Sequence, residues 1–202
     1  MQTDRKTEIL DAFMRLVSQY GIDKTTMQDI AREAEINVAL IYKDFRNKED
    51  LVEAYIYRKI QQIMVECEQI QKQDLPPEQL LHEFISGLFR VIQSSVLQDK
   101  GFWQFVRDEN TIKYLRRMIH KKDSFLQANI KMIEEIMARG VREGVFEIED
   151  LHETAELFLD AFHKYFGMMF KCRTEADLFS GIDKMYALLI KGIRKKAPAA
   201  RV

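Results

Sequence analysis

The sequence has few of the residues that interrupt or cross-link a fold. Its 202 residues include only eight Gly, three Pro and two Cys. So few Gly and Pro leave little room for the frequent turns of an all-β chain. Cys67 and Cys172 lie far apart and outside any CxxC spacing, which argues against a disulfide framework or a zinc knuckle and predicts two reduced packing residues. We therefore expect a nearly all-helical protein.

Long apolar runs and an excess of one charge are also missing. No stretch of 18 apolar residues is present and the start of the chain is polar, so we expect no membrane partner, no secretory signal and a cytoplasmic location. The net charge is −1, and residues 1–50 hold eight Lys or Arg against ten Asp or Glu. Any nucleic-acid site must therefore depend on where single charges are placed, not on bulk charge.

Helical patterns begin near the N-terminus. Apolar residues recur at helical spacing from Ile9 to Tyr20, and Gly21 ends this run as a C-terminal glycine cap does. Thr26 and Asp29 then have the spacing of a capping box, which predicts the start of a second, short helix.

A third helix is predicted at about 38–45, with Asn37 as its N-cap. It is only two turns long, so Ile36, Ile41 and Phe45 must anchor it to its neighbours. Two short helices joined by a tight turn form a helix-turn-helix. The outward positions, which can contact bases or phosphates in a major groove, are Asn37, Val38, Ala39, Leu40 and Lys43 on the third helix and Gln28 on the second.

The remaining chain reads as a series of longer helices. The first is predicted from residue 48 to about residue 72, with Asn47 as its N-cap and Pro76-Pro77 beyond its end. Further runs are predicted at 78–97, 102–118, 122–143, 150–171 and 175–195. Gly144 follows the third of these runs, and a capping box at Thr174 to Asp177 precedes the last.

Residues 25–51 contain an ordered set: Thr25-Thr26-Met27-Gln28-Asp29-Ile30-Ala31-Arg32-Glu33-Ala34, then Ile41-Tyr42, Phe45, Lys48-Glu49 and Leu51. This set resembles the N-terminal part of the TetR family of bacterial transcriptional regulators. The remaining 150 residues resemble the family only in length and helical character. The family usually has Gly where this chain has Glu35, and His or Tyr where it has Asp44, whose carboxylate would repel a phosphate.

The resemblance implies an all-α fold with a helix-turn-helix DNA-binding domain at 1–47 and a helical regulatory domain at 48–202. Within the latter, 48–72 would be the connecting helix and 150–195 the dimerisation helices. The expected function is ligand-responsive transcriptional regulation: a homodimer binds a palindromic DNA operator, most often as a repressor, and a small apolar or amphipathic effector releases it. We expect no cofactor, no metal and no enzymatic activity. The phosphate contacts that the resemblance implies are Thr25, Thr26, Tyr42 and Lys48.

Two segments, Leu157–Phe170 and Leu178–Ile193, are apolar on more than one face and predict packing against a second subunit, with a large monomeric core as the alternative. The candidate dimer-interface residues are Phe158, Tyr165, Ile182, Met185, Tyr186, Leu189 and Ile193. The candidates for an apolar effector pocket are Phe102, Trp103, Phe105, Phe125, Met132, Phe162, Phe166 and Met169, with His163 as a polar handle.

Two other classes of protein remain open. Glu149 with His152, and Asp160 with His163, have the spacing of carboxylate–histidine pairs in di-iron bundles, which would suit a helical ligand-binding or di-iron enzyme. A protein-binding helical scaffold is the other alternative. The sequence has no P-loop, GxGxxG or GxSxG motif, and its basic clusters at 113–122 and 191–201 are interpreted as solvated surface.

Overall fold

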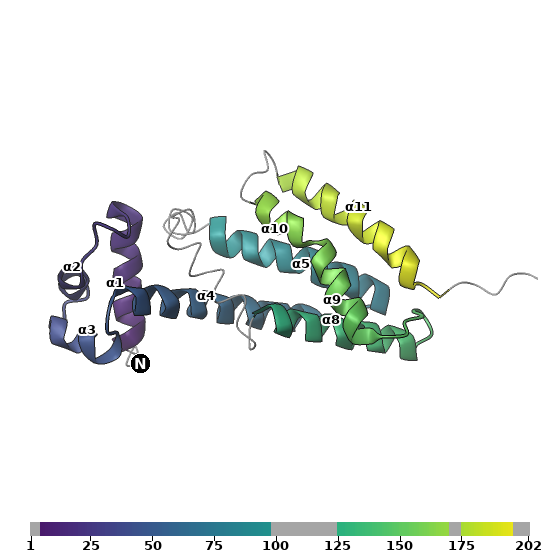
Figure 1. Ribbon diagram of the computed structural model, residues 1–202, viewed down its shortest axis with the longest axis horizontal. Helices are drawn as coiled ribbons and strands as arrows, with labels where there is room; N and C mark the ends of the chain where they lie inside the picture. The colour runs from purple at the N-terminus through teal and green to yellow at the C-terminus, as the bar shows by residue number, and fades with distance from the viewer. Residues whose placement is uncertain (1–4, 98–124, 170–174, 196–202) are drawn as a thin grey trace, which may run out of the picture. The chain divides into compact units, whose positions relative to one another are not determined.

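The computed structural model describes residues 5–97, 125–169 and 175–195 (Figure 1). Within these ranges the chain is helical and contains no strand, only an isolated bridge between Phe146 and Arg194. The all-α prediction is confirmed. The helices are α1 (Arg5–Tyr20), α2 (Met27–Glu33), α3 (Val38–Asp44), α4 (Lys48–Gln71), α5 (Pro77–Leu97), α8 (Phe125–Arg142), α9 (Leu151–Ala161), α10 (His163–Met169) and α11 (Glu175–Ile193).

Two of the predicted features fall on residues that the structure does not describe. The predicted helix at 102–118 and Thr174 of the predicted capping box lie outside the described residues. No helix in the described ranges is both long enough and apolar enough to cross a membrane.

The chain divides into two compact units. The N-terminal unit ends within α4 at Ile63 and takes in the end of α5 from Ile92, whereas the C-terminal unit begins at Met64 and holds α8 to α11. The division falls later than residue 47 because the first half of α4 supplies part of the N-terminal core. These core residues are Leu51, Val52, Tyr55 and Ile56.

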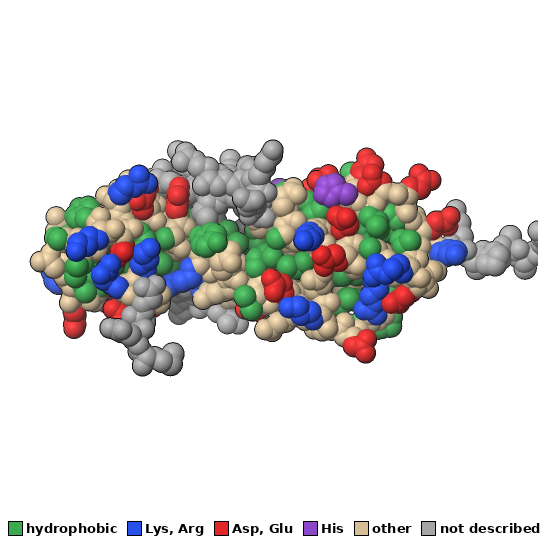
Figure 2. Space-filling model, turned by 90° about the horizontal axis from the view of Figure 1, so that it is seen from below, with side chains coloured by type: hydrophobic (Ala, Val, Ile, Leu, Met, Phe, Trp, Pro, Cys, Tyr) green, Lys and Arg blue, Asp and Glu red, His purple; other side chains and the backbone are tan. Residues whose placement is uncertain are grey.

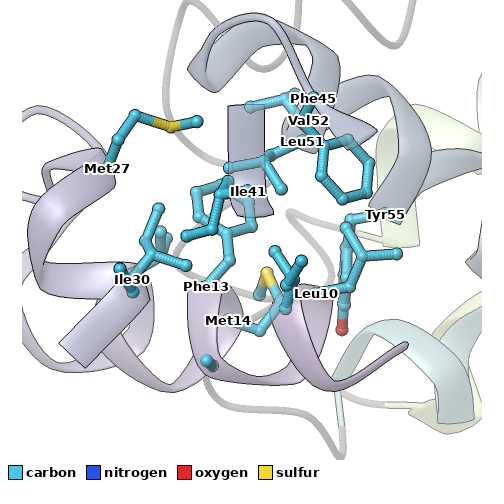
Figure 3. Packing of buried hydrophobic residues seen from close by; sticks show 14 of the residues in the cluster. Leu10, Phe13, Met14, Met27, Ile30, Ile41, Phe45, Leu51, Val52 and Tyr55 are labelled. Carbon is cyan, nitrogen blue, oxygen red and sulfur yellow. The ribbon is translucent and has the colours of Figure 1, made fainter. Parts of the chain in front are cut away.

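One hydrophobic core joins α1, α2, α3 and the start of α4 (Figure 3). Phe13 of α1 and Ile41 of α3 are both fully buried in it. Burial of one such side chain contributes about 1.5–3 kcal/mol, which a two-turn helix needs because it is unstable alone. Phe45, at the C-cap of α3, is buried as well, so the predicted anchoring of this helix is confirmed.

The predicted caps are present at the ends of these short helices. Thr26 Oγ1 accepts a hydrogen bond from Asp29 N at 3.1 Å, and Thr26 N donates to the Asp29 carboxylate at 3.2 Å, which completes the capping box of α2. Asn37 Oδ1 accepts from Ala39 N at 2.9 Å and caps α3. Gly21, after α1, has φ +84°, the left-handed conformation that favours glycine. These local signals therefore fix the orientation of α2 and α3 on α1.

Glu35, in the turn between α2 and α3, has φ +55°. A side chain in the left-handed region costs about 1–2 kcal/mol, and glycine avoids most of that cost. Glu35→Gly is therefore expected to raise the free energy of unfolding by about 0.5–1 kcal/mol in urea titrations, after allowance for the more flexible unfolded chain. Glu66→Gly, on the exposed side of α4, is the matched control and is expected to lower it by about 1 kcal/mol. A lower free energy of unfolding in Glu35→Gly would mean that the left-handed backbone conformation of Glu35 does not strain the folded protein.

In the C-terminal unit α8 packs against α9, and α10 against both α9 and α11 (Figure 1). The prediction of one helix over 150–171 is wrong, because the helix breaks at Phe162. Phe162 N donates to Leu159 O at 3.0 Å and Tyr165 N donates to Phe162 O at 2.9 Å, and such i to i+3 bonds tighten and bend a helix. The bend buries Phe162 completely, with its ring 6.5 Å from that of Phe89. A segment that is apolar on all sides thus buries more of its faces than a straight helix would.

Candidate nucleic-acid interface

The surface of α3 is the first candidate for contact with DNA. Ala39, Tyr42 and Lys43 are exposed there, and Tyr42 keeps 49% of its surface accessible. Leu40 is half-buried, and Val38 packs against the core of the unit, which leaves Val38 little surface for bases. We call Ala39, Leu40, Tyr42 and Lys43 the α3 face. It offers an apolar centre, a phenol and an ammonium group, which suit thymine methyl groups and phosphates.

The polar candidate residues around α3 differ in how many hydrogen-bond donors they have available for DNA. Asn37 and Gln28 are exposed, and the Asn37 amide NH2 remains available because only its Oδ1 forms the cap. The Thr26 hydroxyl donates to the Asp29 carboxylate at 2.6 Å. Thr25 is buried, and its hydroxyl donates to Gly21 O at 2.9 Å. The threonine side chains therefore hold the start of α2 in place in this conformation.

Lys48 supports the same turn from α4. Its Nζ donates to Ile22 O at 2.6 Å and to Thr25 O at 3.2 Å, so the ammonium group fastens the loop between α1 and α2. An ammonium group has three N–H donors, which leaves one for a phosphate. The predicted phosphate contact of Lys48 stays a prediction, now combined with a structural role.

Several arginine and carboxylate side chains of the N-terminal unit form ion pairs. Arg5 pairs with Asp44, and Arg15 pairs with Glu33. Arginines hold further carboxylates of the unit in the pairs Arg32–Asp29, Arg46–Asp50 and Arg58–Asp11. Each pair joins one arginine to one carboxylate, so the pairs compensate these five carboxylates locally but leave the net charge of the unit unchanged. Figure 2 shows Lys and Arg side chains gathered among hydrophobic ones over α1 to α3, at the left of the view.

Asp44, at the end of α3, is the carboxylate closest in sequence to the α3 face. Arg5 Nε donates to Asp44 Oδ2 at 2.8 Å. This hydrogen bond holds the pKa of the Asp44 carboxyl below its usual value, and the charges of Lys6 and Lys43 act in the same direction. Sequence reasoning missed Arg5, because 39 positions separate it from Asp44 and no local pattern links them.

The two aromatic pocket candidates on α10 and at its start, Phe166 and Phe162, pack against Phe89 of α5. Phe162 is fully buried, and the Phe166 ring lies 4.7 Å from that of Phe89. Met132 is buried and Phe125 half-buried, whereas Phe102, Trp103, Phe105 and the side chain of Met169 lie outside the described residues. His163, the predicted polar handle of the pocket, is exposed in the single chain.

A different polar residue lies inside the C-terminal unit. Asn129 of α8 is only 1% exposed, and its Nδ2 donates to Phe125 O at 2.6 Å. Its Oδ1 has no hydrogen-bond partner in the described part of the chain, and neither has the buried Oγ of Ser86 on α5. The sequence carried a signal for Asn129, since it interrupts the apolar stripe that continues through Met132 and Ile136.

The predicted dimer residues need correction. Phe158, Tyr165, Ile182 and Tyr186 are buried within their own chain and have almost no surface to offer a second subunit. Met185, Leu189 and Ile193 are half-buried. The large apolar side chains that α9 and α11 expose are Leu157 at 62% and Leu188 at 65%. Helical spacing identified the apolar helices but not which face packs internally.

His152, one of the histidines of the predicted carboxylate–histidine pairs, lies near carboxylates other than the predicted one. His152 Nδ1 lies 3.2 Å from a Glu134 oxygen, and its Nε2 lies 3.5 Å from one of Glu156 rather than Glu149. No group of three or more side chains able to hold a metal ion is found in the described ranges.

Burial raises the pKa of the Cys67 thiol to about 12, so this cysteine stays protonated and packs as an apolar residue. Cys172 lies outside the described residues.

A helix-turn-helix held on α1, with the second helix of the pair presenting its surface, defines a DNA-binding protein of the helix-turn-helix class. Residues 9–55 match the sequence family "Bacterial regulatory proteins, tetR family", and residues 77–177 match "Tetracyclin repressor-like, C-terminal domain". The chain belongs to the TetR family of bacterial transcriptional regulators.

Individual relatives agree with this assignment. The helix-turn-helix transcriptional regulator YhgD of Bacillus subtilis (strain 168) is 25% identical over 160 residues, which cover 79% of this chain and 81% of YhgD. A TetR-family regulator from Mesorhizobium loti MAFF303099 has the same fold, with a TM-score of 0.69 at 17% identity over 95% of this chain and 97% of that one. RolR in complex with resorcinol has a TM-score of 0.56 at 15% identity, over 94% of this chain and 87% of RolR.

Proposed function

We propose that this protein is a ligand-responsive repressor, which binds a palindromic operator as a homodimer and leaves it when a small apolar or amphipathic effector binds. The observation that carries the DNA-binding part is the α3 face, with Tyr42 and Lys43 exposed beside an apolar centre. Two such helices, one from each subunit, would enter successive major grooves about 34–36 Å apart. Asn37 and Gln28, whose amides are exposed, would contact bases or phosphates at its edge.

Asn129 supports the effector part of the proposal. A buried carbonyl oxygen without a hydrogen bond costs about 1–3 kcal/mol, and a ligand that donates an O–H or N–H to Asn129 Oδ1 would remove this cost. Apolar residues of α8 surround this position on the same stripe. RolR was solved with resorcinol, a small aromatic ring that carries two hydroxyl groups. The expected effector is thus a small, mainly apolar molecule with at least one hydroxyl or N–H group.

The route from effector to DNA is α4. Asn129 Nδ2 lies 3.8 Å from the sulfur of Met64 on α4. The same helix continues back to Leu51 and Tyr55, which belong to the core that holds α3. A ligand that moves α4 would therefore change how the two α3 helices are held, with a coupling free energy of typically about 1–3 kcal/mol.

The homodimer in this proposal uses the surface of α9 and α11. Leu157 and Leu188 are large exposed apolar side chains, and such residues are typical of an interface that another subunit covers. Half-buried Met185, Leu189 and Ile193 would extend this surface along α11. Phosphate contacts would then be present in two copies per operator.

The experiment that tests the proposal combines binding and size. The purified protein is titrated onto a random-sequence DNA duplex at a series of salt concentrations, and its mass is measured by sedimentation. We expect a dimer whose binding constant falls steeply with salt, with a slope of about −0.9 for every phosphate contacted. A monomer, or DNA binding that does not change with salt concentration, would overturn the proposal that this protein is a dimeric DNA-binding repressor.

Asn129→Leu is expected to separate DNA binding from the effector response. The variant should bind DNA as the wild type does and unfold with equal or slightly higher free energy, because it removes an unsatisfied oxygen without leaving a cavity. Release from DNA is measured with a panel of small hydroxylated aromatic compounds. His163→Leu, at the exposed position, is the control and should respond as the wild type does. Equal responses in all three proteins would contradict the role of Asn129.

A further inference from the structure

The charges around Asp44 form a small cluster at the end of α3. Arg5 Nε and Arg5 Nη2 both lie 2.8 Å from Asp44 Oδ2. The Asp44 side chain is 10% exposed, whereas that of Arg5 is 44% exposed. Of the two paired groups, the guanidinium is therefore the one that solvent reaches more easily.

Asp44 has an unfavourable position without this partner. It is the last residue of α3, where the helix dipole disfavours an anion. It also follows directly after Tyr42 and Lys43, the residues proposed to meet the DNA backbone, so an uncovered carboxylate would repel the phosphates that they bind. With Arg5, Lys6 and Lys43 around one Asp44, the cluster is positive overall, although residues 1–50 as a whole are not.

A second pair on α1 gives a standard of comparison. Arg15 Nε donates to Glu33 Oε1 at 2.7 Å, so both pairs join α1 to the last residue of a short helix. Exposed pairs of this kind add little to stability, about 0–1 kcal/mol. The two pairs differ in place, since Glu33 ends α2 and Asp44 ends α3. Of these two pairs, only Arg5–Asp44 therefore lies at the end of α3, next to the α3 face.

We propose that Arg5 is a DNA-backbone-binding residue, which covers the Asp44 carboxylate and presents its exposed guanidinium surface to a phosphodiester at the end of α3. This inference rests on the proposed DNA-binding function. A guanidinium group has five N–H donors in a planar fork, so it can bind a carboxylate on one side and a phosphate on another. Arg5 would thus turn a repulsive position into an attractive one.

The test is a double-mutant cycle with the full-length protein and a random-sequence DNA duplex. The variants are Arg5→Gln, Asp44→Asn and the two combined, with Arg15→Gln as the matched control. Binding constants are measured at several salt concentrations, and thermal unfolding of each variant is recorded. Arg5→Gln is expected to lower the binding constant about tenfold and to reduce the salt slope by about 0.9 for each subunit.

The sign of the Asp44→Asn effect distinguishes the proposal from a structural tie. This variant should bind as tightly as the wild type or more tightly, and the double variant should lose less affinity than Arg5→Gln alone. Equal losses in Arg5→Gln and Asp44→Asn would overturn the inference, because they identify a pair that only supports the fold. Equal losses in Arg5→Gln and Arg15→Gln would overturn it too. Salt-independent binding by the wild type would overturn the proposed function and this inference with it.

Discussion

Replacing Tyr42 and Lys43 together by alanine is expected to lower the affinity for double-stranded DNA by a factor of about 100 or more. Both side chains are exposed on α3, so their loss removes contacts with DNA and leaves the core of the unit intact. A dimer loses each contact twice, and the salt slope should fall with the two ammonium groups. The measurement is fluorescence anisotropy of a labelled duplex over a range of salt concentrations.

The control for this variant is Tyr57→Ala with Lys72→Ala. Tyr57 is an exposed tyrosine on α4, and Lys72 is an exposed lysine directly after the end of that helix, so the control removes the same groups from another surface. It should bind DNA nearly as the wild type does. Equal losses of affinity in the two double variants would mean that α3 is not the recognition helix.

Gly140→Ala is expected to destabilise the C-terminal unit by about 3 kcal/mol. A Cβ at position 140 would lie 2.1 Å from Cδ2 of the Phe146 ring, which is far inside van der Waals contact. The ring is buried and cannot easily withdraw, because the backbone next to it is tied to the end of α11. Glu147 N donates to Ile193 O at 2.8 Å, and Lys195 N donates to Val145 O at 3.0 Å.

The Phe146→Ala background tests the reason for this loss. Without the ring, Gly140→Ala should be neutral or slightly stabilising, since alanine favours a helix over glycine by about 1 kcal/mol. Free energies of unfolding from urea titrations of the wild type, both single variants and the double variant give the coupling between the two positions. Additive effects would show that the close approach of Phe146 is not the cause.

Helices α1 to α3 were predictable because their signals are local. The capping box of Thr26 and Asp29, the Asn37 cap and the Gly21 stop all act over one turn of chain, and each is found where the sequence predicts it. The inward direction of Ile41 followed from the need to anchor a two-turn helix. The outward set on α3 followed in turn, apart from Val38, which packs on the core.

Features that depend on distant partners were not predictable in the same way. The break at Phe162 depends on how its ring meets Phe89, and Arg5 meets Asp44 only after folding. Periodicity identifies an apolar face but not its partner, which is why Tyr165 and Tyr186 were assigned to a dimer and are buried within the chain. Asn129 was visible as a polar residue on an apolar stripe, but its significance depends on its burial and on an Oδ1 that has no hydrogen-bond partner among the described residues.

Recognition of an operator through α3 is tested most directly by selection of bound duplexes from a random DNA pool, carried out in parallel with the wild type and with Leu40→Ala. Leu40 lies at the centre of the α3 face and is only half-buried. Recognition through α3 predicts an enriched inverted repeat for the wild type and an altered preference at symmetric positions for the variant. An absence of any enriched repeat, or the same repeat with the same preferences in both proteins, would contradict recognition of an operator through α3.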